Sequence, residues 1–440
     1  MLDRIFILCV GQNSRYSRYA EMENTAKKKK LRSILLLDMS FTLSMFQERG
    51  LLQALESRKL NGYFGRVISV HPLAGLFKKK DKRFGLPKIT NIDREHCFVE
   101  GTVGISRLFS FFPALNLVLA QVRLLFLLRR MARDAEVDVI RIGDPYYLGV
   151  LGLVLAKLLG VPLVVRTCFD YDLLYAASGR AVFPRLFRFR CVEKRIERFV
   201  FPRCDMVAGA NQSNLEYAIA NGAQRGRGVV FRYGNLIHPI HFSEPEGRGD
   251  ISELSDELQL DGNFMMTVSR LEKMKQPEDN LYVLRALLEV GQNITFLFVG
   301  DGSMRQELAA TAENLGVLAH VRFAGNRSQE TIANLLPHAR LVLSPHMGRG
   351  LTEACLGGSS IVAYDYDWQG EIIVSGETGE LVQNGNWQQM ASTAIWLLKN
   401  PEEGARRGRA ARLLALKMMS PDKLNRIEIA AYENLFRSDV

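Results

Sequence analysis

Two basic residues lie on either side of a predicted strand-to-helix turn in the second half of the chain. In FMMTVSRLEKMKQ, a short apolar run ends at Arg270, and Lys275 begins the next helical pattern. A guanidinium fork and an ammonium point charge that converge across such a turn can hold a diphosphate. Two solvated basic residues in a loop are the plainer interpretation of this pair taken alone.

A second group of residues favours the same class of ligand. In SPHMGRGLTEACLGG, Gly348 and Gly350 remove side chains from a turn that opens a helix, so successive N–H groups can face an anion. Glu353 follows one turn into the helix, where its carboxylate can accept hydrogen bonds from a sugar diol. A ligand whose phosphates bind backbone amides and whose neighbouring hydroxyls bind a carboxylate has the chemistry of a nucleotide sugar. The alternative is that Glu353 only complements the helix dipole.

The elements that must position these residues alternate along the chain. Short apolar runs such as SILLLDMS, VDVIRIGD and ITFLFVGDG are each followed by a helical pattern. This order is typical of parallel sheets covered by helices on both faces. A polar segment after Phe242 separates two such series. We therefore expect an α/β protein with two doubly wound, Rossmann-like domains that face a central cleft.

The net charge of the chain indicates an anionic binding partner but does not identify its class. The 440 residues carry a formal net charge of +10, which suits phosphate esters, an acidic membrane surface or nucleic acid. No aromatic and basic platform for nucleic acid is evident, so we expect no nucleic-acid partner. The six cysteines are scattered without metal-ligand spacing, and no secretory leader is visible. These features predict a cytoplasmic protein with no metal and no cofactor.

One apolar stretch, residues 108–128, approaches the length of a membrane span. Pro113 and Arg123 interrupt it, so it predicts a helix that is buried or rests on a membrane. Basic loops at residues 78–83 and the run RLFRFRCVEKRIERF at 185–199 place Arg and Lys beside aromatic residues. Such faces can lie on anionic lipid headgroups at the inner face of the membrane. A solvated helical face explains the same residues equally well.

The order of the motifs in the second half resembles the C-terminal domain of the family-4 glycosyltransferases with the GT-B fold, also called glycosyltransferase group 1. The resemblance covers residues 264–397 through SRLEKMK, FLFVGDG, VRFAGN, HARLVLSP, GLTEA and GETGELV. It implies that Arg270 and Lys275 hold the donor diphosphate and that Glu353 binds the nucleotide ribose. It further implies that backbone meets the phosphates at Gly350, Leu351 and Thr352, and that Asn326 borders the base.

The sequence departs from the family pattern at one position. Such enzymes carry a spaced pair of glutamates, and Glu353 with the following alanine matches only the second. Pro345 occupies the place of the first, which normally contacts the donor sugar. We expect His346 or Arg349 to supply that contact instead.

The first half resembles the family more loosely, through DVIRIGDPYYLGVLGLVLAKLLGVPLVV and YGNLIHPIHF. The glycine-rich loop often found after the first strand is absent, which suggests altered acceptor contacts. RTCFDYDLL presents Asp170 and Asp172 at a predicted strand end that faces the cleft. One of them is expected to contact the acceptor or the donor sugar; helix capping or a surface carboxylate is the alternative.

The sequence and the resemblance together predict four parts. Residues 1–31 form a basic arm, 32–242 an acceptor-binding domain, 243–418 a nucleotide-sugar-binding domain, and 419–440 a helix that crosses back to the first domain. The implied function is retaining, metal-independent sugar transfer to a glycan or lipid-linked acceptor in cell-surface polysaccharide or glycolipid assembly. Another GT-B enzyme, such as a nucleotide-sugar epimerase or a glucan synthase, and a non-catalytic nucleotide-sugar-binding protein remain as alternatives.

Overall fold

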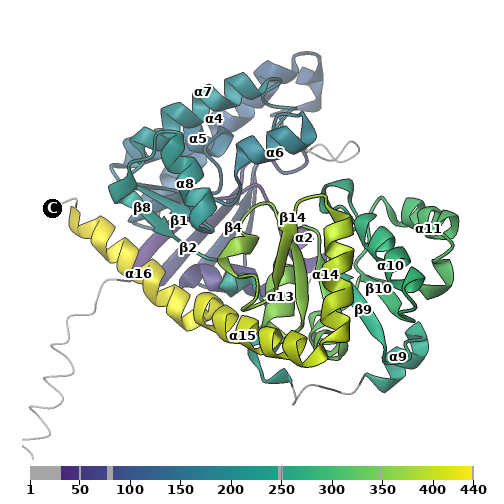
Figure 1. The fold of residues 1–440 in the computed structure, drawn as a ribbon. Coiled ribbons are helices and arrows are strands. Elements are labelled where there is room, and N and C mark those ends of the chain that lie inside the picture. The colour runs from purple at the N-terminus through teal and green to yellow at the C-terminus, as the bar shows by residue number, and fades with distance from the viewer. Residues whose placement is uncertain are drawn as a thin grey trace, which may run out of the picture.

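Two lobes, each built on its own sheet, make up the chain in the computed structural model (Figure 1). The structure describes residues 31–48, 51–76, 83–245, 249, 251–346 and 348–438. Apart from Leu31, the predicted basic arm lies outside these residues. Apart from Arg83, so does the basic loop at 78–83. Arg83 itself pairs with Glu100 at 2.8 Å.

The first lobe holds an eight-stranded sheet in the order β3-β4-β2-β1-β5-β6-β7-β8, parallel except where β3 meets β4. Its strands are β1 (Arg32–Leu37), β2 (Phe64–His71), β3 (Lys88–Asn91), β4 (His96–Glu100), β5 (Val139–Ile142), β6 (Leu163–Thr167), β7 (Met206–Gly209) and β8 (Gly228–Val230). Its helices are α2 (Leu43–Glu48), α3 (Gln53–Glu56), α4 (Pro113–Asp134), α5 (Tyr147–Leu159), α6 (Tyr171–Ser178), α7 (Arg190–Val200) and α8 (Gln212–Ala220). Short 3-10 turns include η1 (Ser57–Lys59), η2 (Arg107–Phe111), η3 (Phe201–Arg203) and η4 (Arg225–Arg227).

The second lobe holds a six-stranded parallel sheet in the order β11-β10-β9-β12-β13-β14. The linker into it contains η5 (Gly234–Leu236) and η6 (Pro239–Phe242). The strands are β9 (Phe264–Val268), β10 (Thr295–Val299), β11 (Val321–Gly325), β12 (Leu341–Ser344), β13 (Ile361–Asp365) and β14 (Glu380–Gln383). The helices are α9 (Ser252–Leu258), α10 (Asp279–Glu289), α11 (Arg305–Asn314), α12 (Gln329–Leu335), α13 (Arg349–Leu356), α14 (Trp387–Lys399), α15 (Pro401–Met419) and α16 (Pro421–Ser438). Further 3-10 turns are η8 (Lys273–Lys275), η9 (Leu318–His320), η10 (Leu336–His338) and η11 (Gln369–Glu371).

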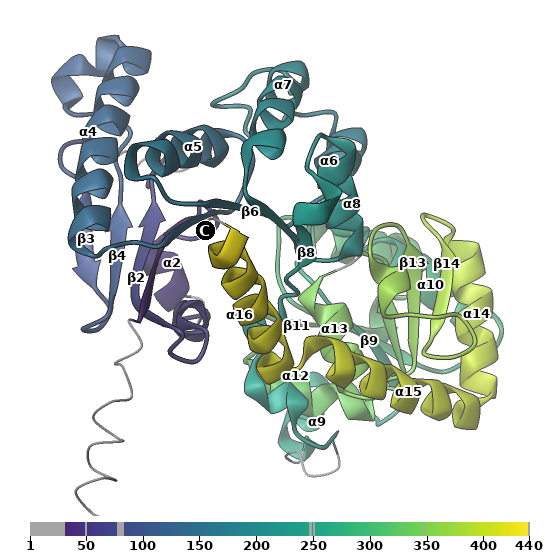
Figure 2. The same cartoon turned by 90° about the vertical axis from the view of Figure 1, so that its left-hand side faces the viewer.

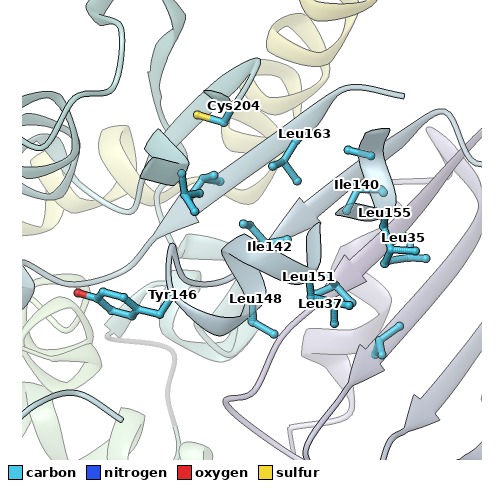
Figure 3. Packing of buried hydrophobic residues seen from close by; sticks show 14 of the residues in the cluster. Leu35, Leu37, Ile140, Ile142, Tyr146, Leu148, Leu151, Leu155, Leu163 and Cys204 are labelled. Carbon is cyan, nitrogen blue, oxygen red and sulfur yellow. The ribbon is translucent and has the colours of Figure 1, made fainter. Parts of the chain in front are cut away.

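Both faces of each sheet are buried, which explains the continuous apolar runs in the strands. On β1, Leu35 and Leu37 pack beneath α5 in one cluster, whereas Ile34 and Leu36 belong to a cluster on the other face. Figure 3 shows the first cluster, with Leu151 of α5 among its labelled side chains. The second sheet is likewise covered on two sides. The prediction of two doubly wound α/β sheets is confirmed.

The apolar stretch at 108–128 forms η2 followed by α4. Pro113 is in the first turn of α4, where a missing N–H costs no intrahelical hydrogen bond, so it begins the helix instead of interrupting it. Leu124 and Leu128 are buried under the sheet, whereas Phe111 and Phe126 are 88% and 62% exposed. Within the described ranges, no helix combines the length and apolar character needed to cross a bilayer.

The last two helices join the lobes (Figure 2). Helix α15 contributes Ala411 and Ala415 to the core of the second lobe. Helix α16 then packs Tyr432 against Ile34 and Phe64 of the first sheet. At the junction, a Cβ on Gly234 of the linker would lie 2.0 Å from the carbonyl oxygen of Met419, so only glycine permits this close approach.

Candidate active site

A pocket opens at the carboxyl ends of the neighbouring strands β9 and β12, where doubly wound sheets bind ligands. We call it the β9–β12 pocket. It brings together residues that were singled out from two separate segments of the sequence: Lys275 from one, and His346 and Gly350 from the other. Its lining consists of Thr267, Val268, Ser269, Lys275, Val342, Leu343, Ser344, Pro345, His346 and Gly350.

Lys275 is the half-buried cation of this pocket. Its Nζ lies 3.0 Å from Nδ1 of His346, within hydrogen-bond distance. The pKa of Lys275 is lowered to about 8, chiefly by burial and also by the charge of Arg270, whereas the charge of Asp367 opposes the change. Lys275 is therefore still mostly protonated at neutral pH, and the two predicted cations are close enough to interact.

Arg270 is exposed beside the pocket, in the turn that follows β9. The glycines of the Gly-Asp-Gly motif position this turn. A Cβ on Gly300 would lie 2.0 Å from the carbonyl oxygen of Ser269, and one on Gly302 would lie 2.3 Å from that of Leu271. These glycines therefore allow the end of β10 to pack against the turn that carries Arg270.

Helix α13 begins next to Lys275. A Cβ built on Gly348 would be 3.7 Å from Nζ of Lys275, which places the start of the helix beside the ammonium group. A Cβ on Gly350 would lie 2.1 Å from the carbonyl oxygen of Val268, so glycine is required for the helix to pack this tightly on β9. The positive end of the helix and a lysine thus face the same space.

The side chains that follow Gly350 point into the protein. Leu351 is in the core of the second lobe, and Oγ1 of Thr352 is 3.0 Å from the hydroxyl of Tyr233. Only the backbone of these two residues is left to meet a ligand. Glu353 is 2% exposed, and burial raises its pKa to about 7, with Arg349 opposing the shift.

The two residues proposed to replace the missing glutamate lie in different places. His346 is in the pocket, and its ring centroid is 5.6 Å from that of Tyr366. Arg349 is exposed and donates a hydrogen bond from Nη1 to the carbonyl of Leu236 at 3.4 Å. The structure therefore brings His346, not Arg349, to Lys275.

Asn326 is exposed and follows edge strand β11. Strand β10 separates β11 from β9, and Asn326 is not among the residues that line the β9–β12 pocket. Its expected contact with a nucleotide base stays a prediction.

The two aspartates of the first lobe have different surroundings. Oδ1 of Asp170 accepts hydrogen bonds from the N–H groups of Asp172 and Leu173, at 2.9 and 3.0 Å, and so caps α6. Asp172 forms ion pairs with Arg190 at 2.9 Å and Lys194 at 2.5 Å on α7. Asp172 therefore fastens α6 to α7, whereas the charge of Asp170 is felt across the gap by Asp367.

Asp367 was not identified from the sequence. It follows β13, and its pKa is raised to about 6 by burial, then by Asp170 and Glu371, with Lys275 opposing. Its Oδ1 is buried and has no hydrogen-bond partner among the described residues. The sequence signal for Asp367 is a charged side chain just past the end of a predicted strand. Arg270 was identified by the same signal.

Glu371 connects the two lobes directly. Its Oε1 accepts hydrogen bonds from the N–H groups of Gln212 and Ser213 at the start of α8, at 2.8 and 3.3 Å. Its Oε2 lies 2.6 Å from Nη2 of Arg232. A carboxylate of the second lobe thus complements the positive end of a helix in the first lobe.

Comparison with known proteins gives two family matches. Residues 251–414 match the family described as "Glycosyl transferases group 1", and residues 92–234 match the "Glycosyl transferase 4-like domain". The first range contains Lys275, His346 and Glu353, and the second contains Asp170.

Among curated proteins, the chain is similar to glycogen synthase of Mycobacterium tuberculosis, with 27% identity over 152 residues, 34% of this chain and 37% of that protein. It is also similar to N-acetyl-alpha-D-glucosaminyl L-malate synthase of Bacillus anthracis, with 26% identity over 195 residues, 42% of this chain and 49% of that protein. The chain thus spans less than half the length of these curated relatives. The solved structure of Anabaena Alr3699/HepE in complex with UDP and glucose has the same fold, with a TM-score of 0.65, 21% identity, and coverage of 92% of this chain and 99% of that chain.

Proposed function

We propose, from the premise that the chain belongs to the group 1 glycosyltransferases with the GT-B fold, that it transfers a sugar from a nucleotide-sugar donor to a glycan or lipid-linked acceptor. One observation carries the proposal: the ammonium group of Lys275 lies beside the start of α13 in the pocket at the end of β9. An ammonium group and a helix N-terminus together form a site for a diphosphate.

The chemistry requires stabilisation of the leaving group. An acceptor hydroxyl attacks the anomeric carbon while the bond from that carbon to the diphosphate oxygen breaks, and the proton of the hydroxyl passes to an oxygen of the departing diphosphate. Negative charge grows on the departing diphosphate, and fixed positive groups lower the barrier where that charge develops. Lys275, Arg270 and the first amides of α13 supply this stabilisation without a metal.

The nucleoside end of the donor extends along α13. The carboxylate of Glu353 is buried, and among the described residues Arg349 is the cation whose charge acts on it, so it is suited to accept hydrogen bonds from the two ribose hydroxyls. The backbone of Gly350, Leu351 and Thr352 meets the phosphates, and Asn326 borders the base.

The sugar end of the donor lies toward the first lobe. His346 contacts a sugar hydroxyl in place of the missing glutamate. Asp367 adds a carboxylate whose Oδ1 has no hydrogen-bond partner among the described residues and can accept from a second hydroxyl. The charge of Asp170 on the first lobe acts on Asp367, which supports a sugar contact for Asp170, whereas the ion pairs of Asp172 favour a structural role for that residue. Together these groups determine which donor sugar the enzyme accepts. The reaction retains the anomeric configuration.

An apolar surface on the first lobe supports a lipid-linked acceptor and an anionic membrane surface. Helices α4, α5 and α7 pack side by side on one face of the sheet. Exposed apolar side chains on these helices and just before them are Phe111 of η2, Phe112 at the start of α4, Phe126 of α4, Val154 of α5 and Phe199 of α7. The exposed side chains of Arg123, Arg130, Arg195 and Arg198 lie on the same helices. We infer a protein at the cytoplasmic face of a membrane, in cell-surface polysaccharide or glycolipid assembly.

A non-catalytic nucleotide-sugar-binding protein is the second candidate, because Pro345 stands where the sugar-binding glutamate is expected. Incubation with a panel of labelled nucleotide sugars tests both candidates. Transfer, or slow hydrolysis without acceptor, identifies an enzyme. Saturable binding of a donor without release of sugar identifies the binding protein.

A further inference from the structure

A second pocket lies at the hinge, apart from the β9–β12 pocket, and the two have no lining residue in common. We call it the hinge pocket. Its walls come from the first sheet, from the linker at Arg232 and Asn235, and from Glu428 of α16. Two strand arginines, Arg141 of β5 and Arg166 of β6, complete its basic side.

Strand geometry explains why these arginines share one side of the sheet. Val139 and Val164 belong to the cluster that packs against α16. Side chains alternate along a strand, so Arg141 and Arg166, two residues further along, face the same way at the carboxyl ends of neighbouring strands. Two guanidinium groups are thus brought together beneath the linker.

The positive charges in and around the hinge pocket outnumber their carboxylate partners. Arg141 pairs with Glu428 at 3.1 Å, Arg232 with Glu371 at 2.6 Å, and Arg58 of η1 with Asp38 at 3.1 Å. By contrast, Arg166 donates from Nη2 to the carbonyl oxygen of Phe231 at 3.1 Å and forms no ion pair among the described residues.

Several donors of this cluster lack acceptors. Nε of Arg166, Nη1 of Arg232 and Nη1 of Arg58 are buried without a hydrogen-bond partner among the described residues. The pKa of Arg58 is lowered to about 10, chiefly by burial; the charge of Asp38 opposes this change, and the charges of Arg141 and Arg166 contribute to it. Buried, unpaired donors on charged groups are costly, and a bound anion would satisfy them.

We propose that the hinge pocket binds a phosphate-class oxyanion through Arg166 and Arg232, with Arg141 beside it. Three guanidinium groups approach from β5, β6 and the linker, which suits a tetrahedral anion that offers oxygens in several directions. The anion comes either from free phosphate in solution or from the phosphate of a lipid-linked molecule.

The position of the site links it to the arrangement of the lobes. Arg232, which would hold the anion, also pairs with Glu371, and Glu371 caps α8 across the gap between the lobes. An anion that engages Arg232 competes with Glu371 for the same guanidinium group. Anion binding is therefore coupled to the contact that joins the two lobes.

The test is thermal unfolding of the full chain in increasing sodium phosphate, compared with sodium chloride at the same ionic strength. Phosphate is expected to raise the Tm saturably beyond the effect of chloride, because a ligand that binds only the native state stabilises it. Because the β9–β12 pocket can also bind phosphate, the comparison is made in the Lys275→Met variant, which removes the ammonium group of that pocket. Lys275→Met should retain a phosphate-specific rise, and adding Arg166→Met to it should abolish that rise. No phosphate-specific rise in the wild type, or a rise already lost with Lys275→Met alone, overturns the proposal.

Two further experiments complete the test. The first uses a conservative variant in case Arg166→Met fails to fold, and the second identifies the source of the anion. Arg166→Lys keeps the charge but loses the fork, and it should weaken phosphate binding measured by equilibrium dialysis. Unchanged binding would contradict the assignment. A prenyl monophosphate in detergent, compared with detergent alone, should displace labelled phosphate if the anion is lipid-borne; without displacement, free phosphate is the ligand.

Discussion

Replacing Lys275 with alanine removes a positive charge that we place against the departing diphosphate. The Nζ lies beside the start of α13 in a half-buried pocket, where charge interactions are stronger than in water. Loss of one preorganised contact to a developing anion costs about 2.7–4 kcal/mol of transition-state stabilisation. We therefore expect the kcat of Lys275→Ala to fall by roughly a hundredfold to a thousandfold.

The chain offers a matched control for this experiment. Lys273 lies in the same 3-10 turn, but its side chain is exposed and lies outside the β9–β12 pocket. Turnover is measured as release of labelled sugar from the preferred nucleotide sugar, with and without acceptor. Lys273→Ala should retain wild-type kcat. If Lys275→Ala also turns over at the wild-type rate, the reasoning about leaving-group stabilisation is refuted.

Four further predictions concern the donor and the membrane. Glu353→Gln should weaken donor affinity in calorimetry by about tenfold or more, because a carboxylate with two accepting oxygens for the ribose hydroxyls is replaced by an amide with one; unchanged affinity would remove the ribose role. The pKa of Lys275 is about 8, so its protonated form disappears as pH rises through that value and donor affinity should fall by up to about tenfold per unit above it. This slope should vanish in Lys275→Met, and a slope that persists there belongs to another group. His346→Ala should alter donor affinity or turnover, and a variant equal to wild type would show that His346 does not contact the sugar. Phe111→Ser should reduce sedimentation with anionic vesicles, whereas Leu413→Ser, at a residue 70% exposed on α15, should not; equal losses would argue against a membrane face on α4.

The fold was predictable because its signal is local. A strand buried on both faces must be apolar at nearly every position, and β1, β10 and β12 satisfy this rule in the sequence. Glycines such as Gly350 were also recognisable, although the sequence did not reveal that Val268 is the neighbour that excludes a side chain. The interruption expected at Pro113 was wrong because a proline in the first turn of a helix looks the same in sequence as one in the middle.

The remaining parts of the site depend on contacts between distant segments. Asp172 and Asp170 lie in one short motif, and only the packing of α7 shows that Asp172 is held by Arg190 and Lys194. The approach of Asp367 to Lys275 follows from the order of β9, β12 and β13 in the sheet, which spacing along the chain does not specify.

One arginine of the hinge pocket has a recognisable signal in the sequence. Arg141 interrupts VDVIRIGD, and a guanidinium on a central buried strand requires an acceptor. The sequence could have indicated that need. The acceptor itself, Glu428 on α16, is supplied by the last helix and became visible only in the folded chain.

A crystal structure of the full chain with a nucleoside diphosphate tests the central claim most directly. We predict that the terminal phosphate lies within hydrogen-bond distance of Nζ of Lys275 and of the first amides of α13, with the ribose hydroxyls on Glu353. A diphosphate bound away from Lys275, with the start of α13 facing solvent, would contradict the account.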